Sequence, residues 1–320
     1  MIPTEAPTVS VVIPARDDAP ALDACLRALA AQTHRPFEIV VVDNASTDDT
    51  AAVALRHGAR VVREEQVGIP AAASTGYDAA RGDVIARLDA DSLVPADWVA
   101  KVSRAMADPS VDAVTGVGHF YDLPRGLGRP AAALYLGSYF VLCHAALGHP
   151  ALWGSAMAVR REVWAQVRDQ VHRDDPEVHD DLALSFALGP RRRTVLDRSL
   201  AVGASGRCLR GWAQTRRRFR RAFRTLRLGW AVSPPWERWR TALTRPPQRA
   251  LSPFRPRSPV RRARVSEASR CRRAPTRTRA STAPRSSPTR WRRWPARSRT
   301  SSSANSCPHP TPPHPHPTPS

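Results

Sequence analysis

The sequence has few cysteines, and no pattern among them would hold a metal ion or a disulfide framework. Its 320 residues include five cysteines, an odd number, at positions 25, 143, 208, 271 and 307. No Cys-x-x-Cys pair and no Cys/His spacing typical of zinc sites occurs. The sequence therefore supports neither a zinc module nor a small secreted fold held by disulfides.

The sequence also lacks a signal-peptide pattern and has only one long apolar window. Residues 1–5 contain no basic segment followed by an apolar one. The most apolar window, 131–147, has about the length of a membrane span. It contains Gly137, Ser138 and His144, however, and is rich in alanine. The pattern predicts a buried or interfacial helix rather than a span, and we expect a cytoplasmic protein.

Acidic residues are almost absent from residues 233–320, which differ from the rest of the chain. This stretch contains 20 arginines, no lysine, two acids and 18 of the 31 prolines, and it carries most of the formal net charge of +21. It has no apolar periodicity and cannot bury a core, so we expect a disordered Arg/Pro/Ser-rich tail. A further hypothesis is that the tail is a frame-shifted translation of a GC-rich gene, which would leave the product without a needed C-terminus.

Strand-like and helix-like patterns alternate along the rest of the chain. β-branched runs at 9–13 and 37–42 are each followed by turns rich in capping residues and then by apolar positions at helical spacing, as in 22–29. This alternation is typical of a mostly parallel sheet flanked by helices. We therefore expect an α/β fold of Rossmann-like type over residues 1–232.

Two aspartates follow the apolar strand expected at 84–88. Asp89 and Asp91 are spaced i, i+2, so they would share one face of an extended strand, whereas a turn after Asp89 would let them converge. Carboxylates at the carboxyl edge of a parallel sheet suit Mg²⁺ or Mn²⁺ carrying a diphosphate, because these ions leave positions open for phosphate oxygens. The alternative is that both aspartates are solvated turn residues.

Four segments resemble known motifs and occur in a matching order along the chain. They are residues 11–16 (VVIPAR), 41–48 (VVDNASTD), 88–91 (LDAD) and 179–182 (HDDL). Together they resemble glycosyltransferase family 2, the large inverting group with the GT-A fold, in its actinobacterial form. The resemblance covers roughly residues 8–210. It implies a nucleotide-sugar half at about 8–118 and an acceptor half at about 119–232, with the tail outside the family.

The resemblance implies roles for the matched residues. Nucleotide-sugar contacts are implied for Pro14, Ala15, Arg16, Asp43 and Asp89, and binding of Mn²⁺ or Mg²⁺ for Asp91 with Asp89. A different interpretation of Asp43 is that it only caps the helix that follows it.

A transfer that proceeds by direct displacement needs a base for the attacking hydroxyl, and a carboxylate is the natural group. We assign this catalytic role to Asp181, with Asp180 as the alternate. Crowding by Asp180, Asp174 and Asp175 would raise the proton affinity of Asp181. The alternative is that the acidic pair only favours the N-terminus of a helix.

Two departures from the family pattern limit the prediction. Where the family commonly carries Ala-Arg-Asn, this chain has Ala72-Ala73-Ser74, so two side chains that help to hold the nucleotide are absent. No intact Gln-x-x-Arg-Trp signature follows residue 205, which argues against a processive polysaccharide synthase. The first strand is followed by Pro14-Ala15-Arg16 without glycine, which argues against a nucleotidyltransferase.

The sequence predicts a metal-dependent inverting glycosyltransferase. Its expected partners are a UDP-, GDP- or dTDP-sugar donor and a glycan or lipid-linked acceptor. The basic helix expected at 210–227 could contact the inner face of the membrane peripherally or could be a solvated charged helix. The alternative function is an impaired protein of the same fold whose basic tail binds anionic membrane or nucleic acid, the latter without sequence specificity.

Overall fold

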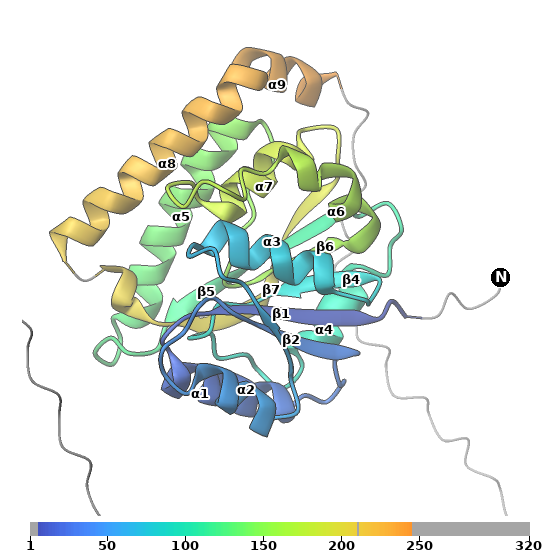
Figure 1. Cartoon of the computed structure of the whole chain (residues 1–320). Coiled ribbons are helices and arrows are strands. Elements are labelled where there is room, and N and C mark those ends of the chain that lie inside the picture. Colours follow the sequence, from blue (N-terminus) through green and yellow to red (C-terminus); the bar gives the residue numbers. More distant parts are fainter. Residues whose placement is uncertain (1–5, 210, 245–320) are drawn as a thin grey trace, which may run out of the picture. The chain divides into compact units, whose positions relative to one another are not determined.

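The computed structural model describes residues 6–209 and 211–244, and in these residues one sheet of seven strands forms the centre of the fold (Figure 1). The strands are β1 (Val9–Ala15), β2 (Glu38–Asp43), β3 (Arg60–Arg63), β4 (Val84–Arg87), β5 (Ala113–Phe120), β6 (Met157–Arg160) and β7 (Thr194–Ala204). Their order across the sheet is β3-β2-β1-β4-β6-β5-β7. Strand β6 runs antiparallel to β4 and β5, and the other paired strands are parallel. The expected mostly parallel α/β sheet is confirmed.

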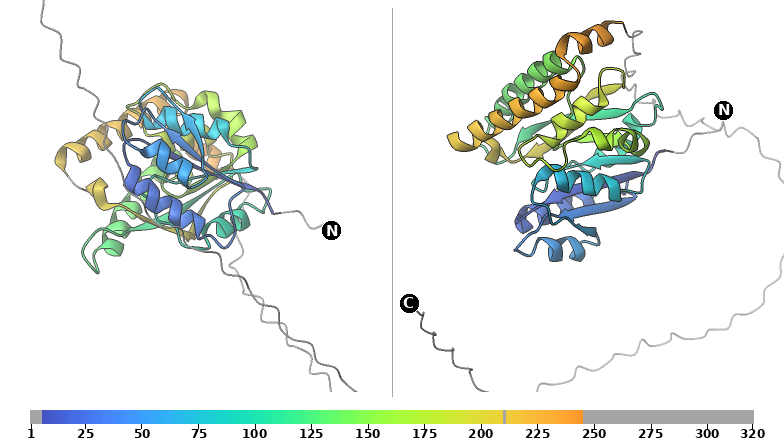
Figure 2. Two further views of the ribbon diagram at one scale, coloured as in Figure 1. Left: turned by 60° about the horizontal axis from the view of Figure 1, so that its bottom comes forward. Right: turned by 45° about the horizontal axis from the view of Figure 1, so that its top comes forward.

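Helices cover both faces of this sheet, and a further group lies outside them (Figures 1 and 2). One face is covered by α1 (Ala19–Ala30), α2 (Thr50–Arg56) and α4 (Trp98–Ala105). The other is covered by α3 (Ile69–Ala79), α6 (Arg161–Val167, continued by the 3-10 turn Arg168–Gln170) and α7 (Asp180–Leu188). The remaining helices are α5 (Gly128–Leu147), α8 (Trp212–Val232), which follows the 3-10 turn Gly206–Leu209, and α9 (Pro235–Leu243). We call α5, α8 and α9 the outer layer.

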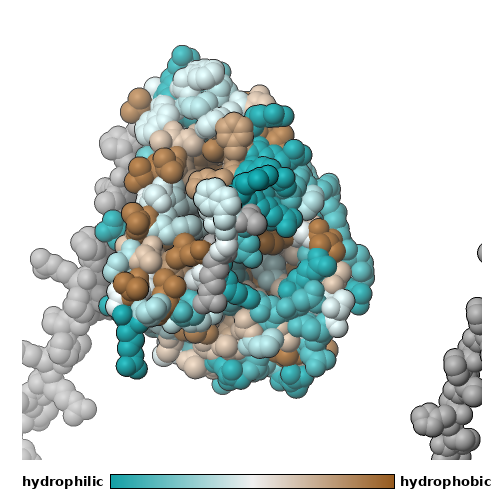
Figure 3. Space-filling model, turned by 90° about the vertical axis from the view of Figure 1, so that its left-hand side faces the viewer, coloured by the Kyte–Doolittle hydropathy of each residue, from teal (hydrophilic) through white to brown (hydrophobic). Residues whose placement is uncertain are grey.

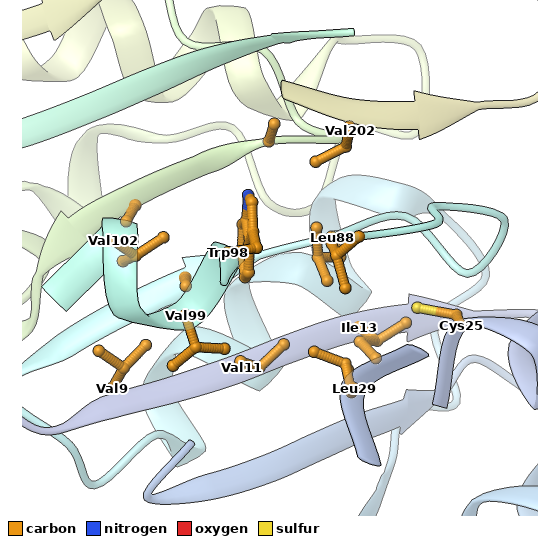
Figure 4. Close-up of a cluster of buried hydrophobic side chains, with 14 of the residues drawn as sticks. Val9, Val11, Ile13, Cys25, Leu29, Leu88, Trp98, Val99, Val102 and Val202 are labelled. Atoms are coloured by element: carbon orange, nitrogen blue, oxygen red, sulfur yellow. The ribbon is translucent and has the colours of Figure 1, made fainter. Parts of the chain in front are cut away.

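The core follows from the alternation of side chains along the buried strands. In β1, Val11 and Ile13 face α1 and α4, whereas Val12 faces α3. Figure 4 shows the first of these clusters, in which Trp98 of α4 lies among side chains of β1, Leu88 after β4 and Val202 of β7. Since successive side chains of a strand point to opposite faces, the almost wholly apolar strands seen in the sequence are those with helices on both sides.

Strand β6 has the opposite direction because of where the chain enters it. After β5 the chain forms α5 and then returns to the carboxyl edge of the parallel strands, where Ser155 contacts Asp89. The next residues pair in antiparallel register, Met157 with Arg87 and Ala158 with Ala86. The helix therefore lies beside the sheet and does not cross over it, so that β6 runs away from this edge.

The last strand of the sheet is irregular. Strand β7 continues to Ala204 beyond the polar residues Asp197 and Ser199, and its pairing with β5 shifts register between Thr115 and Val117. The irregularity hides the second half of the strand from a simple apolar pattern.

The segment expected to be disordered from residue 233 begins with a helix. Helix α9 (Pro235–Leu243) buries Arg238, whose guanidinium donates to the Leu147 and Phe186 carbonyls. This part of the expectation was wrong, because a buried arginine on an Arg-rich segment gives no apolar signal. Residues 245–320 lie outside the described residues, so the disorder and frameshift hypotheses for them stay predictions.

Candidate active site

The candidate residues gather at the carboxyl edge of the sheet. Parallel strands end at the same edge, so the loops after β1, β2, β4, β5 and β7 lie close to one another. One contact group shows this directly: Nη2 of Arg207, after β7, lies 2.7 Å from Asp18 Oδ2 and 2.8 Å from Asp91 Oδ2. Residues almost two hundred positions apart are thereby brought into one site.

The residues expected to contact a nucleotide lie at the ends of β1 and β2. Pro14 and Ala15 are in strand β1 opposite Val42 and Asp43, and Arg16 follows with a largely exposed side chain. Asp43 is buried, and its Oδ1 accepts the Ser46 N–H at 3.0 Å. The carboxylate thus orders the turn after β2, while among the described residues no hydrogen bond to its second oxygen is seen.

Two further aspartates tie the first two loops together. Asp17 Oδ1 accepts the Thr47 N–H at 2.7 Å, and Asp48 Oδ2 accepts the Ala19 N–H at 3.0 Å. The Thr47 N–H lowers the pKa of the Asp17 carboxyl below its ordinary value. The loops that flank Asp43 are therefore held in place before any ligand binds.

Asp89 and Asp91 are separated by the expected turn, closed by the Ser92 N–H donating to the Asp89 carbonyl at 3.0 Å. The Asp89 carboxylate is used on both sides: Oδ1 accepts from Arg87 at 2.9 Å and Oδ2 accepts the Ser155 hydroxyl. Asp91 has a side chain 19% exposed and bonds Arg207. Burial and the Asp89 charge raise the pKa of Asp91, and Arg207 partly offsets this.

The donor set at this edge fits a divalent ion that is only partly coordinated by protein. Among residues 6–209 and 211–244 no group of three or more His, Cys, Asp or Glu side chains could enclose a metal ion. Mg²⁺ and Mn²⁺ are commonly held by one or two carboxylates and complete their shell with phosphate oxygens and waters. Asp91 already attracts a cation, the Arg207 guanidinium, so Asp91 with Asp89 beside it has the chemistry that such an ion requires.

A buried arginine connects the metal-type carboxylates with the acidic pair of α7. The side chain of Arg87, the last residue of β4, is 4% exposed. It lies 2.9 Å from Asp89 Oδ1 and 3.3 Å from Asp180 Oδ2. Burial lowers the pKa of Arg87, but the charges of Asp180 and Asp89 outweigh burial and raise it above the ordinary value.

The acidic pair is divided between two environments. Asp180 has a side chain 13% exposed, and its Oδ2 accepts no hydrogen bond among the described residues. Burial, with help from the charges of Asp181 and Asp89, raises the pKa of Asp180 to about 6 in spite of Arg87. Asp181 Oδ2 instead accepts the Gly154 N–H at 3.0 Å.

The expected crowding of Asp181 is met only in part. Asp180 is adjacent, but Asp175 pairs with Arg224 of α8 at 2.7 Å. On its other side Asp181 faces Tyr139 and Cys143 of α5. Burial is the largest cause that raises the pKa of the Cys143 thiol to about 12 and the pKa of Tyr139 well above its ordinary value, and the charge of Asp181 is the second cause. Asp181 therefore lies between the 154 loop and α5.

Gly154 is required by the close approach of Arg87. A Cβ atom at this position would lie 1.5 Å from Arg87 Nη1. The backbone here passes directly over the guanidinium while its N–H reaches Asp181, which no residue with a side chain would allow without moving Arg87.

Sequence reasoning missed Arg87, Arg207 and Ser155. A signal existed for Arg87, since one charged residue inside an apolar strand must find partners when buried. None existed for Ser155 and Arg207, whose roles depend on β6 and β7 returning to this edge. Ala72, Ala73 and Ser74, which stand where the family commonly carries Ala-Arg-Asn, are buried on α3.

Comparison with known proteins gives a consistent result. The model of the family described as "Glycosyl transferase family 2" matches residues 10–167. An uncharacterized glycosyltransferase of Mycobacterium tuberculosis is 42% identical over 108 residues, which cover 34% of this chain and 47% of that protein. The chain thus spans about half the length of the curated relatives it matches.

Solved structures extend the similarity to the fold. A mannosyltransferase from Pyrobaculum calidifontis, in complex with GDP-Man and Mn²⁺, has a TM-score of 0.54 at 25% identity and covers 75% of this chain and 74% of its own. Glucosyl-3-phosphoglycerate synthase from Mycobacterium tuberculosis, in complex with Mn²⁺, UDP and glucosyl-3-phosphoglycerate, has a TM-score of 0.50 at 19% identity, covering 69% and 78%. The expected GT-A fold is confirmed.

Proposed function

Because the chain belongs, through residues 10–167, to glycosyl transferase family 2, we propose that it transfers a sugar from a nucleotide-sugar donor to a hydroxyl acceptor. The proposed reaction is metal-dependent and inverts the configuration at the anomeric carbon. The observation that carries this proposal is the pair of contacts by which buried Arg87 links Asp89, two residues before Asp91, to Asp180 of the acidic pair at the start of α7.

The donor would lie across the ends of β1, β2 and β4. Pro14, Ala15 and Arg16 would border the nucleotide, and Asp43 would accept hydrogen bonds from its base. Asp89 would face the sugar and diphosphate. The GDP-Man and Mn²⁺ bound by the mannosyltransferase neighbour support a donor of this class, with UDP- and dTDP-sugars as the alternatives.

Asp91, assisted by Asp89, would hold Mn²⁺ or Mg²⁺. The ion would act as a Lewis acid on the departing diphosphate. Arg207 adds positive charge at the same edge, since its guanidinium lies between Asp18 and Asp91. Arg87 fixes the orientation of Asp89 and neutralises part of the carboxylate charge that a diphosphate would otherwise meet.

Asp181 is the proposed base. It would take the proton of the acceptor hydroxyl as the oxygen bonds to the anomeric carbon, while the bond from that carbon to the diphosphate oxygen breaks and the diphosphate leaves with the electron pair. The Gly154 N–H holds Asp181, and Asp180 is engaged with Arg87. We assign Asp180 to positioning Arg87.

The acceptor would reach Asp181 at the carboxyl edge of the sheet, beside the loop that carries Gly154. We propose a glycan or lipid-linked acceptor, as in cell-wall glycan synthesis, used on the cytoplasmic side.

A thermal-shift experiment on the full chain tests the proposal. The chain is heated with UDP-, GDP- and dTDP-sugars, each with and without Mn²⁺, and the same series is run on Asp91→Ala. We expect one nucleotide class to stabilise the wild type by about 2–3 kcal/mol at a hundredfold excess over its Kd, only with metal. Asp91→Ala should lose the shift, and Asp169→Ala, whose side chain is 96% exposed, should keep it. A metal-independent shift that survives Asp91→Ala would refute the metal assignment.

A further inference from the structure

The outward side of α5 is an apolar surface that no described residue covers. Leu134, Val141 and Leu142 are 77%, 69% and 66% exposed. Between Arg129 and His144 the helix has no Asp, Glu, Lys, Arg or His. Among the described residues α5 is the one helix long and apolar enough to span a membrane, and only 17% of its most apolar window is buried. An exposed apolar face of this length marks a contact with something other than water.

The outward side of α8 alternates aromatic and basic side chains. Phe219 and Phe223 are exposed, and Arg216 and Arg227 flank them on the same side of the helix. Other arginines of α8 turn toward the acidic loop before α7, where Arg217, Arg220 and Arg221 bond Glu177 and Arg224 bonds Asp175. The outward arginines have no such acidic partner among the described residues, so their charge is available to an external anion.

Helix α9 joins these faces into one surface. The indole of Trp239 donates to the Ala145 carbonyl at 2.8 Å, and that of Trp230 donates to the Ala146 carbonyl at 3.1 Å, so both α9 and the end of α8 pack on the end of α5. Trp236 and Leu243 remain exposed. Figure 3 shows hydrophobic side chains gathered on this side of the molecule.

We propose that the outer layer is a docking surface for an anionic lipid bilayer, with the outward face of α5 entering the boundary between headgroups and acyl chains. Its composition argues for lipid over a second copy of the chain. The three helices contain ten arginines and a single acid, Glu237, and two such surfaces would repel each other. Exposed tryptophan, leucine and arginine on one face are the combination that helices lying in a membrane interface use.

The surface begins where the active site ends. Helix α5 starts just after Tyr121 and Asp122 at the carboxyl edge of β5, and α8 starts just after the turn that carries Arg207. A bilayer on the outer layer would therefore bring the membrane surface next to this edge. The docking does not depend on the proposed transferase activity, because the surface stands on its own residues.

Vesicle sedimentation of the full chain tests the proposal without any donor or metal. Vesicles of phosphatidylglycerol mixed with phosphatidylcholine are compared with phosphatidylcholine alone. The variant Leu134→Ser/Val141→Ser/Leu142→Ser keeps all charges, including those of residues 245–320. The control Phe37→Ser/Leu55→Ser removes two similarly exposed apolar side chains elsewhere. Measurements at about 0.5 M salt suppress contacts that are only electrostatic.

We expect the triple variant to lose about tenfold or more in affinity for the mixed vesicles, a loss that persists at high salt, and the control to bind like the wild type. Arg216→Gln/Arg227→Gln should reduce the preference for phosphatidylglycerol at low salt. Equal binding by the wild type and both outer-layer variants would overturn the proposal. So would a wild-type dimer in light scattering that the triple variant converts to a monomer while vesicle binding is unchanged.

Discussion

The carboxyl edge of the sheet and the outer layer each contain a buried arginine, but the partners of the two guanidinium groups differ. At the edge, Arg87 is buried between two carboxylates, Asp89 and Asp180. In the outer layer, Arg238 is buried with no carboxylate within salt-bridge distance among the described residues, and it is held by the carbonyls of Leu147 and Phe186. The first arrangement fixes the positions of one arginine and two carboxylates, whereas the second uses an arginine to join helices.

Removing Arg87 should have the largest effect on stability, because it removes the buried ion pairs at the carboxyl edge of the sheet. Arg87→Met leaves Asp180 buried without its partner, and such losses cost about 3–5 kcal/mol. We expect this decrease in the free energy of unfolding in urea titration, together with loss of nucleotide-dependent stabilisation. Arg81→Met, at an exposed position in the segment between α3 and the same strand, should change stability by less than about 0.5 kcal/mol.

A second substitution separates the charge effect from simple loss of packing. Combining Arg87→Met with Asp180→Leu removes the unpaired carboxylate, so part of the lost stability should return while the nucleotide response stays absent. If the single variant is as stable as the wild type, Arg87 is not the structural link between the two acidic groups.

The two regions also differ in how much the sequence could predict. Asp43, Asp89 and Asp91 end apolar strands, and a parallel sheet brings strand ends together, so their common edge follows from local pattern. Arg207 and Ser155 reach the same edge only because β6 reverses direction and β7 continues past Asp197, and no local pattern encodes either event. Long-range register decides these contacts.

Local sequence pattern predicts less of the outer layer, because its packing also depends on long-range contacts. The apolar window 131–147 correctly predicts a helix, and its outward exposure depends on tertiary packing. Helix α9 is held by Arg238, Trp239 and their carbonyl acceptors. Hydrogen bonds to carbonyls leave no apolar periodicity, so a boundary drawn at residue 232 from composition cut off an element that packs on α5.

Arg238→Ala should have a smaller effect than loss of Arg87. It leaves the Leu147 and Phe186 carbonyls and the His149 ring without a donor and removes the guanidinium that lies 4.7 Å from the Phe186 ring centroid. Removing a buried charge without a counter-ion offsets part of this cost, since burial already lowers the pKa of Arg238 to about 10. We expect a net loss of about 2 kcal/mol in urea titration.

The exposed neighbour Arg240 is the matched control on the same helix. Arg240→Ala should leave the unfolding midpoint within about 0.5 kcal/mol of the wild type. Faster amide hydrogen exchange confined to α9 in Arg238→Ala would show that the lost stability comes from the anchoring of this helix. Equal midpoints for both variants would mean that Arg238 does not anchor the helix.

The smallest expected effect is a difference in pH dependence between the two regions. His149 donates from Nδ1 to the Pro150 carbonyl and accepts from Arg238 at Nε2, an arrangement that suits the neutral ring. Burial, and next the charge of Arg238, lower the pKa of His149 from 6.5 to about 4. Below about pH 6.5 the unfolded chain therefore binds a proton that the folded chain does not, so His149 makes the fold less stable as the pH falls toward 4.

Asp180 has the opposite sign, because its pKa is raised from 3.8 to about 6. The stability linked to its proton is fully present below about pH 4 and is lost as the pH rises through about 6. The two effects oppose each other in the wild type, and single variants reveal them. Between pH 7 and pH 5, His149→Gln should remove a destabilisation of up to about 2 kcal/mol, whereas Asp180→Asn should make the fall in stability toward acid steeper. Urea titrations at both pH values measure this, and parallel pH profiles for the two variants would show that the two regions do not differ in the way described.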